Sequence, residues 1–293
     1  MDIAKTNGKV APSSLEGLHT YPTEARAREQ IVITKGLTRR YGAFTAVDGI
    51  DLEVRSGEVF GLLGPNGAGK TTTIKMLVTL LPPSAGHAWV GGFDVERQSD
   101  NVRRLLGYVP QALSADGNLT GKQNLEVFAK LYDVPRVERR DRIDDALHFM
   151  GLSESANKMV STYSGGMIRR LEIAQTLIHR PRLLFLDEPT IGLDPVARRA
   201  VWEHLTTLRE QYGTTLFVTT HYMEEAEELC TRIAIMNRGK IVALGMPGTL
   251  IEAVGAHDAT LEDAFAHFTG DSIESGGTYR DVRQARRTAG RLR

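Results

Sequence analysis

The sequence has little cysteine, no excess of charge of either sign and no long apolar run. One cysteine, Cys230, occurs among 293 residues, so the chain cannot close a disulfide within itself and fits a reducing compartment. Lysine plus arginine and aspartate plus glutamate each number 36, so the overall charge gives no sign of nucleic-acid binding. A membrane span needs about 18 consecutive apolar residues, and no segment approaches that length. Residues 1–30 lack the apolar core and cleavage site of a signal peptide.

The distribution of apolar residues predicts an ordered α/β region between two weakly patterned ends. Residues 1–30 mix serine, proline, glycine and alternating charge, so we expect a flexible extension there, with a short helix around 23–29. Over residues 31–255, strand-like runs alternate with helical spacing, which predicts a mainly parallel sheet. Residues 256–293 form a C-terminal extension with one predicted helix at 261–268, and its composition from residue 271 predicts disorder or a tail that orders on a partner.

The predicted elements within the ordered region follow from local patterns. The predicted strands are 31–34, 46–54, 59–63, 87–90, 105–109, 183–186, 215–219, 233–236 and 241–244. The predicted helices are 73–77, one from residue 120, one around 143–150, one from residue 164 and one from residue 194 to 211. The neighbours of Cys230 read as helical, so we expect its thiol to be a packed small side chain.

The most informative segment is a loop between a predicted strand and a predicted helix. Its nine residues are Gly64, Pro65, Asn66, Gly67, Ala68, Gly69, Lys70, Thr71 and Thr72. They match the phosphate-loop pattern G-x-x-x-x-G-K-[ST], in which glycines let backbone N–H groups converge on an anion at a helix N-terminus. Lys70 would reach the β- and γ-phosphates, and the Thr71 hydroxyl would hold Mg²⁺. The alternative is a glycine-rich turn that binds nothing, and the complete pattern argues against it.

Two acidic side chains end the predicted strand at 183–186. Asp187 and Glu188 stand at its carboxyl tip, the edge of an α/β sheet where ligands collect. Asp187 suits a water-mediated grip on Mg²⁺, and Glu188 can face an attacking water as a general base. His221 also follows a strand, and Gln111 follows a strand and a proline. Taken alone, either residue would be an ordinary hydrogen-bonded side chain.

Ser164, Gly165 and Gly166 open another predicted helix and form a second anion site. One nucleotide does not need two such sites on separate parts of one chain. The two sites are explained if the serine–glycine site of one copy covers the nucleotide held by another copy. The sequence therefore favours a dimer with shared active sites.

With these elements in order, residues 31–245 resemble the ATP-binding subunit of an ABC transporter. The matching elements are Gly64–Thr72 (Walker A), Gln111 (Q-loop), Ser164–Gly166 (signature), Asp187 and Glu188 (Walker B and catalytic glutamate), Gly192–Asp194 (D-loop) and His221 (switch histidine). Tyr41, just before Gly42, falls where the family stacks an aromatic ring on adenine. A core tyrosine is the competing interpretation of Tyr41.

The resemblance implies an α/β fold of the P-loop NTPase type. It would have a mainly parallel core sheet, an N-terminal antiparallel β subdomain and a helical subdomain at about 112–180. ATP and Mg²⁺ would lie between two subunits held head to tail, with Asp194 contributing to the shared site. Glu188 would polarise the water and His221 would hold the γ-phosphate. Gln111 would join Mg²⁺ and link it to a membrane partner.

Two positions depart from the family's commonest signature, since Tyr163 replaces a leucine and Met167 replaces a glutamine. The backbone donors of the signature remain, whereas one amide side chain is lost. Ser-Gly-Gly-Met followed by basic residues, together with Leu261–Phe265, resembles the daunorubicin-resistance type of exporter. That type implies separate ABC-2 type permease subunits, docked on the helical subdomain, and export of drugs, antibiotics or lipid-linked molecules. It places the chain at the cytoplasmic face of the cell membrane, as a homodimer or paired with a related cassette.

A soluble ABC ATPase acting on nucleic acid or ribosomes is the alternative function. DNA-repair relatives carry coiled coils or cysteine pairs between the Walker A loop and the signature, and here residues 73–162 are short and free of cysteine. Translation-factor relatives carry two cassettes, and this chain has one. Arginines in the segment 280–293 could touch nucleic acid or anionic lipid, but a solvated tail is the simpler interpretation, so no nucleic-acid partner is expected. A non-hydrolysing regulatory cassette is a third possibility, and the presence of Glu188 and His221 gives it no support.

Overall fold

The computed structural model describes residues 29–270 of the chain. Residues 1–28 of the extension predicted at 1–30, with most of its short helix, and the predicted tail at 271–293 lie outside the described residues. The predicted boundary at residue 30 was slightly late, because Gln30 already belongs to the first strand. The described part contains two sheets, one antiparallel and one mainly parallel, with helices packed around them. This confirms the α/β class predicted from the sequence.

The N-terminal sheet is antiparallel and has the strand order β2-β1-β4-β5. Its strands are β1 (Gln30–Tyr41), β2 (Phe44–Arg55), β4 (Ala85–Val90) and β5 (Phe93–Asp94). Strand β1 runs well beyond the predicted 31–34. Its pairing with β2 shifts register between Thr34 and Leu37, which is where the predicted strand ended. Gly36 lies in that irregularity with φ +56°, a conformation that glycine adopts without strain. The irregularity interrupts the alternation by which strands are recognised.

The central sheet has six strands in the order β10-β9-β3-β8-β7-β6. They are β3 (Val59–Leu63), β6 (Leu106–Val109), β7 (Leu183–Asp187), β8 (Thr215–Thr220), β9 (Arg232–Asn237) and β10 (Lys240–Gly245). The five strands from β9 to β6 are parallel, and β10 pairs antiparallel with β9. Their carboxyl ends therefore meet at one edge, where the loops after β3, β7 and β8 begin.

Both faces of the central sheet are buried, as the unbroken apolar runs of its parallel strands require. Successive residues of β7 divide between two cores. Leu184 packs in the core that lies against the helices of residues 121–212, whereas Phe185 packs in the core shared with the antiparallel sheet. The rings of Phe60 and Phe217 continue this second core, with centroids 5.2 Å apart.

The helices begin at recognisable caps in several places. Their bounds are α2 (Lys70–Leu77), α3 (Ser99–Leu105), α4 (Gly121–Leu131), α5 (Arg136–Phe149), α6 (Gly165–Leu177), α7 (Pro195–Tyr212), α8 (Met223–Leu229), α9 (Pro247–Glu252) and α10 (Leu261–Thr269). Thr120 forms the predicted capping box with Gln123, and Asp194 caps α7 ahead of the proline. Helix α2 starts three residues earlier than predicted. Helices α3 and α9 were not predicted, whereas α8, which ends just before Cys230, agrees with the helical neighbours predicted for that residue.

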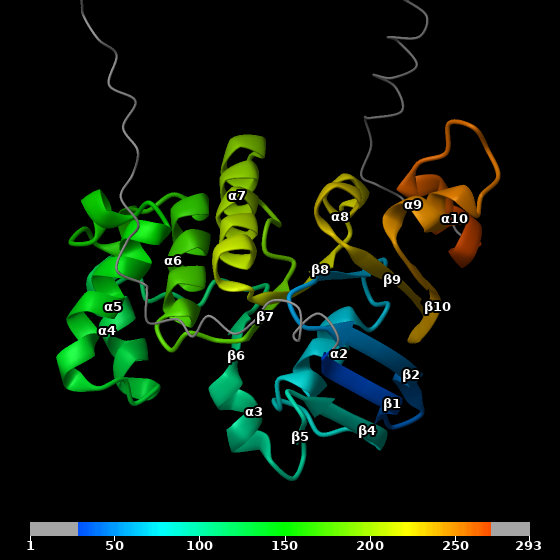
Figure 1. Ribbon diagram of the computed structural model, residues 1–293, viewed down its shortest axis with the longest axis horizontal. Helices are drawn as coiled ribbons and strands as arrows, with labels where there is room; N and C mark the ends of the chain where they lie inside the picture. The colour runs from blue at the N-terminus through cyan, green and yellow to red at the C-terminus, as the bar shows by residue number, and fades with distance from the viewer. Residues whose placement is uncertain (1–28, 271–293) are drawn as a thin grey trace, which may run out of the picture.

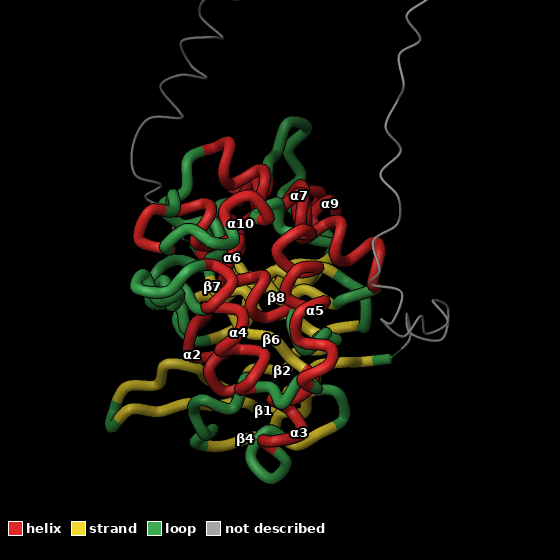
Figure 2. Tube along the Cα trace, turned by 90° about the vertical axis from the view of Figure 1, so that its left-hand side faces the viewer, coloured by secondary structure: helices red, strands yellow, loops and turns green. Residues whose placement is uncertain are grey.

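The elements occupy distinct parts of the molecule (Figure 1). Helices α4, α5 and α6, within the range 112–180 predicted to be helical, gather at one end, and β1, β2 and β4 lie at the other. A view from the side shows β6, β7 and β8 between helix α7 and the antiparallel strands β1 and β4 (Figure 2). Helix α10 packs on α8, α9 and the last two strands. Within residues 29–270, no helix is both long and apolar enough to cross a bilayer.

Candidate nucleotide-binding site

The loop from β3 to α2 is built so closely against its neighbours that only glycine fits at two positions. A Cβ atom on Gly64 would lie 2.4 Å from the Met236 carbonyl oxygen, and one on Gly69 would lie 2.5 Å from that of Ala46. Gly69 also has φ +111°, in the left-handed region. The loop leads directly into the N-terminus of α2, whose free N–H groups attract an anion.

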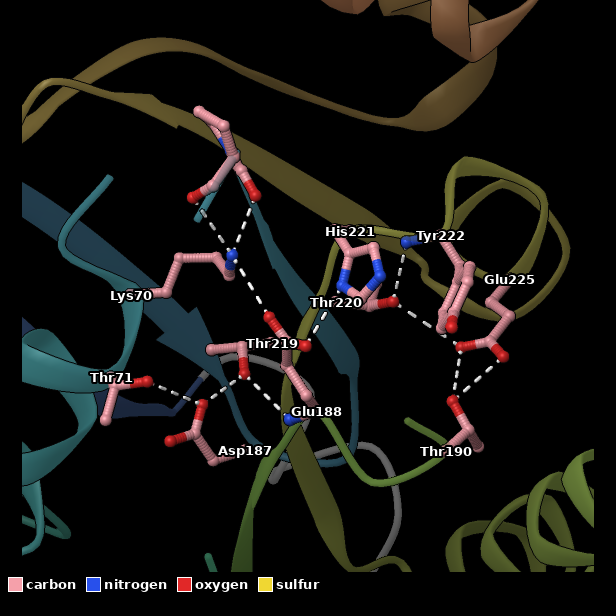
Figure 3. Close-up of polar contacts among 12 residues, drawn as sticks. Lys70, Thr71, Asp187, Glu188, Thr190, Thr219, Thr220, His221, Tyr222 and Glu225 are labelled. Carbon is pink, nitrogen blue, oxygen red and sulfur yellow. Dashed lines mark hydrogen bonds and ion pairs between the residues drawn. The ribbon is translucent and has the colours of Figure 1, made fainter. Parts of the chain in front are cut away.

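Lys70 lies at the start of α2 with its side chain folded back over the loop (Figure 3). Its Nζ donates to the carbonyl oxygens of Gly64, at 2.7 Å, and Pro65, at 3.2 Å. The same nitrogen lies 3.2 Å from Glu188 Oε1. Lys70 Nζ therefore lies between the loop carbonyls and the Glu188 carboxylate.

Asp187 ends β7 next to the loop and accepts hydrogen bonds on one oxygen. Its Oδ1 receives the Thr71 hydroxyl at 3.2 Å and the Thr219 hydroxyl at 2.6 Å (Figure 3). Its Oδ2 is buried and has no hydrogen-bond partner within the described chain. An unpartnered buried carboxylate oxygen beside a threonine hydroxyl fits a hydrated Mg²⁺, which prefers oxygen ligands and keeps several waters.

Glu188 follows Asp187 with its backbone held in an unusual conformation. Its φ is +49°, rare for a residue with a side chain and costly unless its surroundings enforce it. The Glu188 N–H donates to the carbonyl and the hydroxyl of Thr219, and its Oε2 lies 3.0 Å from His221 Nδ1. Burial would raise the pKa of the Glu188 carboxyl, but the hydrogen bond from His221 and the charge of Lys70 outweigh it, so this pKa is lowered. Glu188 is therefore a carboxylate that can accept a proton.

The structure joins five of the predicted site residues into one network, in which Thr219 links Asp187 to Glu188. The five are Lys70, Thr71, Asp187, Glu188 and His221. Four other parts of the predicted site are exposed and separate from these contacts, namely Tyr41, Gln111, the pair Ser164–Gly165 and Asp194. The Ser164 hydroxyl caps α6 by accepting from Met167 N, and the Asp194 carboxylate caps α7.

Gln111 belongs to a loop whose backbone is hydrogen-bonded to a side chain of α6. Arg169, a fully buried residue of α6, donates to the carbonyl oxygens of Pro110, at 2.7 Å, and Gln111, at 2.9 Å. Its Nη1 also pairs with Glu172 at 3.0 Å, and Glu172 accepts from the backbone N–H and the hydroxyl of Ser114. The side chain of Gln111 is left at the surface.

The two unusual residues of the serine–glycine motif differ in their surroundings. Tyr163 is buried, and its hydroxyl donates to the Ser155 carbonyl at 2.6 Å. It thus fills the place of the usual leucine as a packed residue, whereas Met167 is partly exposed.

Cys230 is buried, and burial raises the pKa of its thiol to about 12, which confirms the prediction of a packed, unreactive side chain.

Thr219 was missed by the sequence analysis, although it holds both acidic residues in place. It pairs with Asp187 across the parallel strands β7 and β8. The available signal was two threonines at the end of a strand, next to His221, at the edge where Asp187 also ends its strand.

Comparisons with known proteins agree with this geometry. A family model described as "ABC transporter" matches residues 47–191. The daunorubicin/doxorubicin resistance ATP-binding protein DrrA of Streptomyces peucetius is 43% identical over 240 residues, which cover 82% of this chain and 71% of that protein. The chain belongs to the ABC transporter family. This confirms the predicted resemblance to ATP-binding subunits of the daunorubicin-resistance type, and the cassette is an ABC-type ATPase.

Two solved structures resemble the cassette over most of its length. An ATP-binding subunit of an ABC transporter has a TM-score of 0.73 and 27% identity, covering 81% of this chain and 99% of that one. A dimeric ATP-binding cassette in a post-hydrolysis state, bound to ADP and Pi, has a TM-score of 0.66 and 26% identity, covering 73% and 98%. Both support the α/β cassette fold predicted from the sequence.

Proposed function

We propose that two copies of the cassette close around MgATP and that hydrolysis drives export of a drug-like, antibiotic or lipid-like molecule through separate membrane subunits. One observation carries the shared-site part of this proposal. Lys70, Thr71, Asp187, Glu188 and His221 form one contact network, whereas the exposed Ser164 and Gly165 begin a different helix. A second copy can bring its serine–glycine motif over the phosphates held by the first.

Each residue of the network then has a chemical role. The backbone N–H groups of the loop and Lys70 would bind the phosphates, while the Thr71 hydroxyl and the Asp187 carboxylate would hold Mg²⁺. When bound, Mg²⁺ neutralises the negative charge that develops on the phosphate oxygens. Glu188 would accept the proton of the attacking water, His221 would orient Glu188 and contact the γ-phosphate, and Gln111 would add an oxygen ligand to the metal.

The membrane partner is proposed from the surface of the helices α4 and α5 and from the relatives. Leu131 and Val137 are 70% and 86% exposed, and Leu113 and Val127 lie exposed in the same range, 112–180. Apolar side chains gathered on one subdomain are typical of a protein–protein contact. The drug named for the Streptomyces relative supports an exported substrate of similar chemistry, and the cassette would sit at the cytoplasmic face of the membrane through its permease.

The shared site is tested by mixing two inactive variants. Lys70→Met removes the phosphate contact, and Gly165→Asp places a carboxylate against the γ-phosphate. A Cβ atom on Gly165 would meet only Leu193, at an ordinary 3.6 Å, so the second variant should fold. Each variant alone should be inactive, and an equal mixture should recover about a quarter of wild-type ATPase, because half the dimers have one intact site. A mixture as inactive as its components would contradict shared sites.

The membrane contact is tested by substitutions that leave the nucleotide site untouched. Leu131→Asp should lose co-purification with a co-expressed ABC-2 type permease and keep its ATPase activity. Met246→Asp is the matched control, since Met246 is 59% exposed and precedes α9, where aspartate is a good cap. Equal recovery of the permease with both variants would contradict docking on the helical subdomain.

A further inference from the structure

Glu225 is a buried carboxylate of α8 that the nucleotide chemistry does not use. Its side chain is 7% exposed, yet it carries oxygens that need partners. The Thr190 hydroxyl lies 2.9 Å from both carboxylate oxygens, and the Thr220 hydroxyl lies 3.5 Å from Oε2 (Figure 3). Burial raises the pKa of this carboxyl against the opposing effects of Thr190 and Arg198. Burying a carboxylate here is costly, so its contacts call for an explanation.

The first set of contacts holds the segment Gly192–Asp194 from both sides. Thr190 lies just before this segment, and its carbonyl oxygen accepts from Leu193 N at 3.2 Å. Arg198 lies just after it, in the first turns of α7, and its Nε forms an ion pair with Glu225 Oε1 at 3.2 Å. Glu225 therefore holds the loop whose last residue, Asp194, is exposed.

The second set of contacts leads to His221. Thr220 directly precedes His221, and its hydroxyl accepts from Tyr222 N at 2.9 Å, which closes the turn that carries the histidine. The Arg198 guanidinium lies 4.2 Å from the centre of the Tyr222 ring, and this ring lies 4.2 Å from the ring of His221. The His221 ring thus packs on Tyr222, and both Arg198 and Thr220 link this segment to Glu225.

We propose that Glu225 is a positioning residue that couples the Gly192–Asp194 loop to His221, so that the histidine is oriented for hydrolysis when that loop is seated against the partner subunit. This inference rests on the proposed shared-site function. Glu225 touches neither the phosphate loop nor Asp187 among the described contacts, so it acts through Thr190, Arg198 and Thr220. Its loss should therefore affect turnover and dimer closure while leaving ATP affinity in place.

The test compares Glu225→Gln with Glu228→Gln, an exposed position on the same helix. Glutamine keeps the size of the side chain but removes the charge that Arg198 pairs with. We expect Glu225→Gln to lower kcat about tenfold, because the ion pair that holds Arg198 is lost, with KM for ATP changed less than twofold. The Glu228→Gln variant should match the wild type in both. Glu225→Asp, which keeps the charge, should recover part of the lost kcat.

Two further measurements separate positioning from simple stabilisation. Thr190→Val should lower kcat in the same way, and the double variant with Glu225→Gln should be no worse than the poorer single variant, since both remove the same link. A lowered melting temperature with normal kcat per nucleotide-binding site would overturn the proposal, and so would strictly additive effects.

Dimer closure is measured in the Glu188→Gln background by gel filtration with ATP. Trapping should be strong with Glu188→Gln alone and weaker when Glu225→Gln is added. If Glu188→Gln itself traps no dimer, the proposed shared-site function fails. If it traps a dimer that Glu225→Gln leaves unchanged, the present inference alone is overturned.

Discussion

The Lys70 ammonium lies 3.2 Å from the Glu188 carboxylate, and the two side chains are only 5% and 6% exposed. The cation of the phosphate loop is therefore paired with the proposed general base. A phosphate group offers Lys70 stronger acceptors than one carboxylate oxygen. We expect phosphate binding to draw Lys70 away from Glu188, which frees that carboxylate for the attacking water. Glu188 would in this way be held ready until ATP arrives.

Replacing Glu188 with glutamine should separate binding from turnover. Glu188→Gln removes the proton acceptor but keeps the size of the side chain, so ATP binding should persist while ATPase activity falls by about 10²–10⁴-fold. A closed dimer should accumulate with ATP and be visible by gel filtration. Undiminished ATPase activity in this variant would remove Glu188 as the base.

Asp187→Asn should change the metal requirement more than nucleotide affinity. The substitution removes the negative charge of the carboxylate whose Oδ2 is buried and unpartnered, so the Mg²⁺ concentration for half-maximal ATPase should rise roughly tenfold. ATP binding measured in EDTA should stay near the wild-type value, because the phosphate loop is intact. An unchanged Mg²⁺ titration would place the metal elsewhere.

Tyr41 is predicted to stack on adenine through its ring. The side chain is 48% exposed, and the guanidinium of Arg39 lies 4.8 Å from the ring centre. Tyr41→Ala should raise KM for ATP by up to about tenfold, the value of one aromatic contact, with little change in kcat. Tyr41→Phe keeps the ring and should behave as wild type. Equal KM values for all three proteins would return Tyr41 to a purely structural role.

His179 should make the fold sensitive to acid. Its ring stacks on Tyr132 with centroids 3.8 Å apart, and its Nε2 donates to the Leu106 carbonyl. Burial lowers the pKa of His179 to about 4 from the usual 6.5. Between these pH values the unfolded chain binds a proton that the native state does not, so stability falls as the pH drops through this window.

The effect of His179 on the pH dependence should be on the order of 2 kcal/mol in the free energy of unfolding. His179→Phe should flatten the dependence measured by urea denaturation between pH 7 and pH 4.5. His148→Gln, at an exposed position, is the control and should leave the slope unchanged. The same slope in all three proteins would show that another group titrates.

Patterns that lie within one segment were predictable from the sequence. The phosphate loop needs glycines at particular places for close backbone contacts, and Gly64 and Gly69 meet that need. Buried parallel strands are continuous apolar runs, and the strand before Asp187 is one. The caps at Thr120 and Asp194 are also local, since each side chain binds N–H groups two or three residues ahead.

Elements without a local signal were missed. Helix α3 has seven residues and no side-chain cap, so packing against β5 and β6 decides it rather than its own pattern. The roles of Thr219 and Glu225 depend on contacts between segments far apart in the chain. A sequence shows the hydroxyl or the carboxylate but not which loop it meets.

The buried pair Arg169–Glu172 constrains how this chain can change over generations. Losing one partner would strand the other charge in the interior and cost about 3–5 kcal/mol, whereas exchanging both for apolar residues of similar volume can be nearly neutral. The two positions are one turn apart on α6, and both bind the segment 110–114: Arg169 donates to the Pro110 carbonyl, and Glu172 accepts from Ser114. We expect them to covary in related sequences, so that a substitution at 169 is inherited together with one at 172.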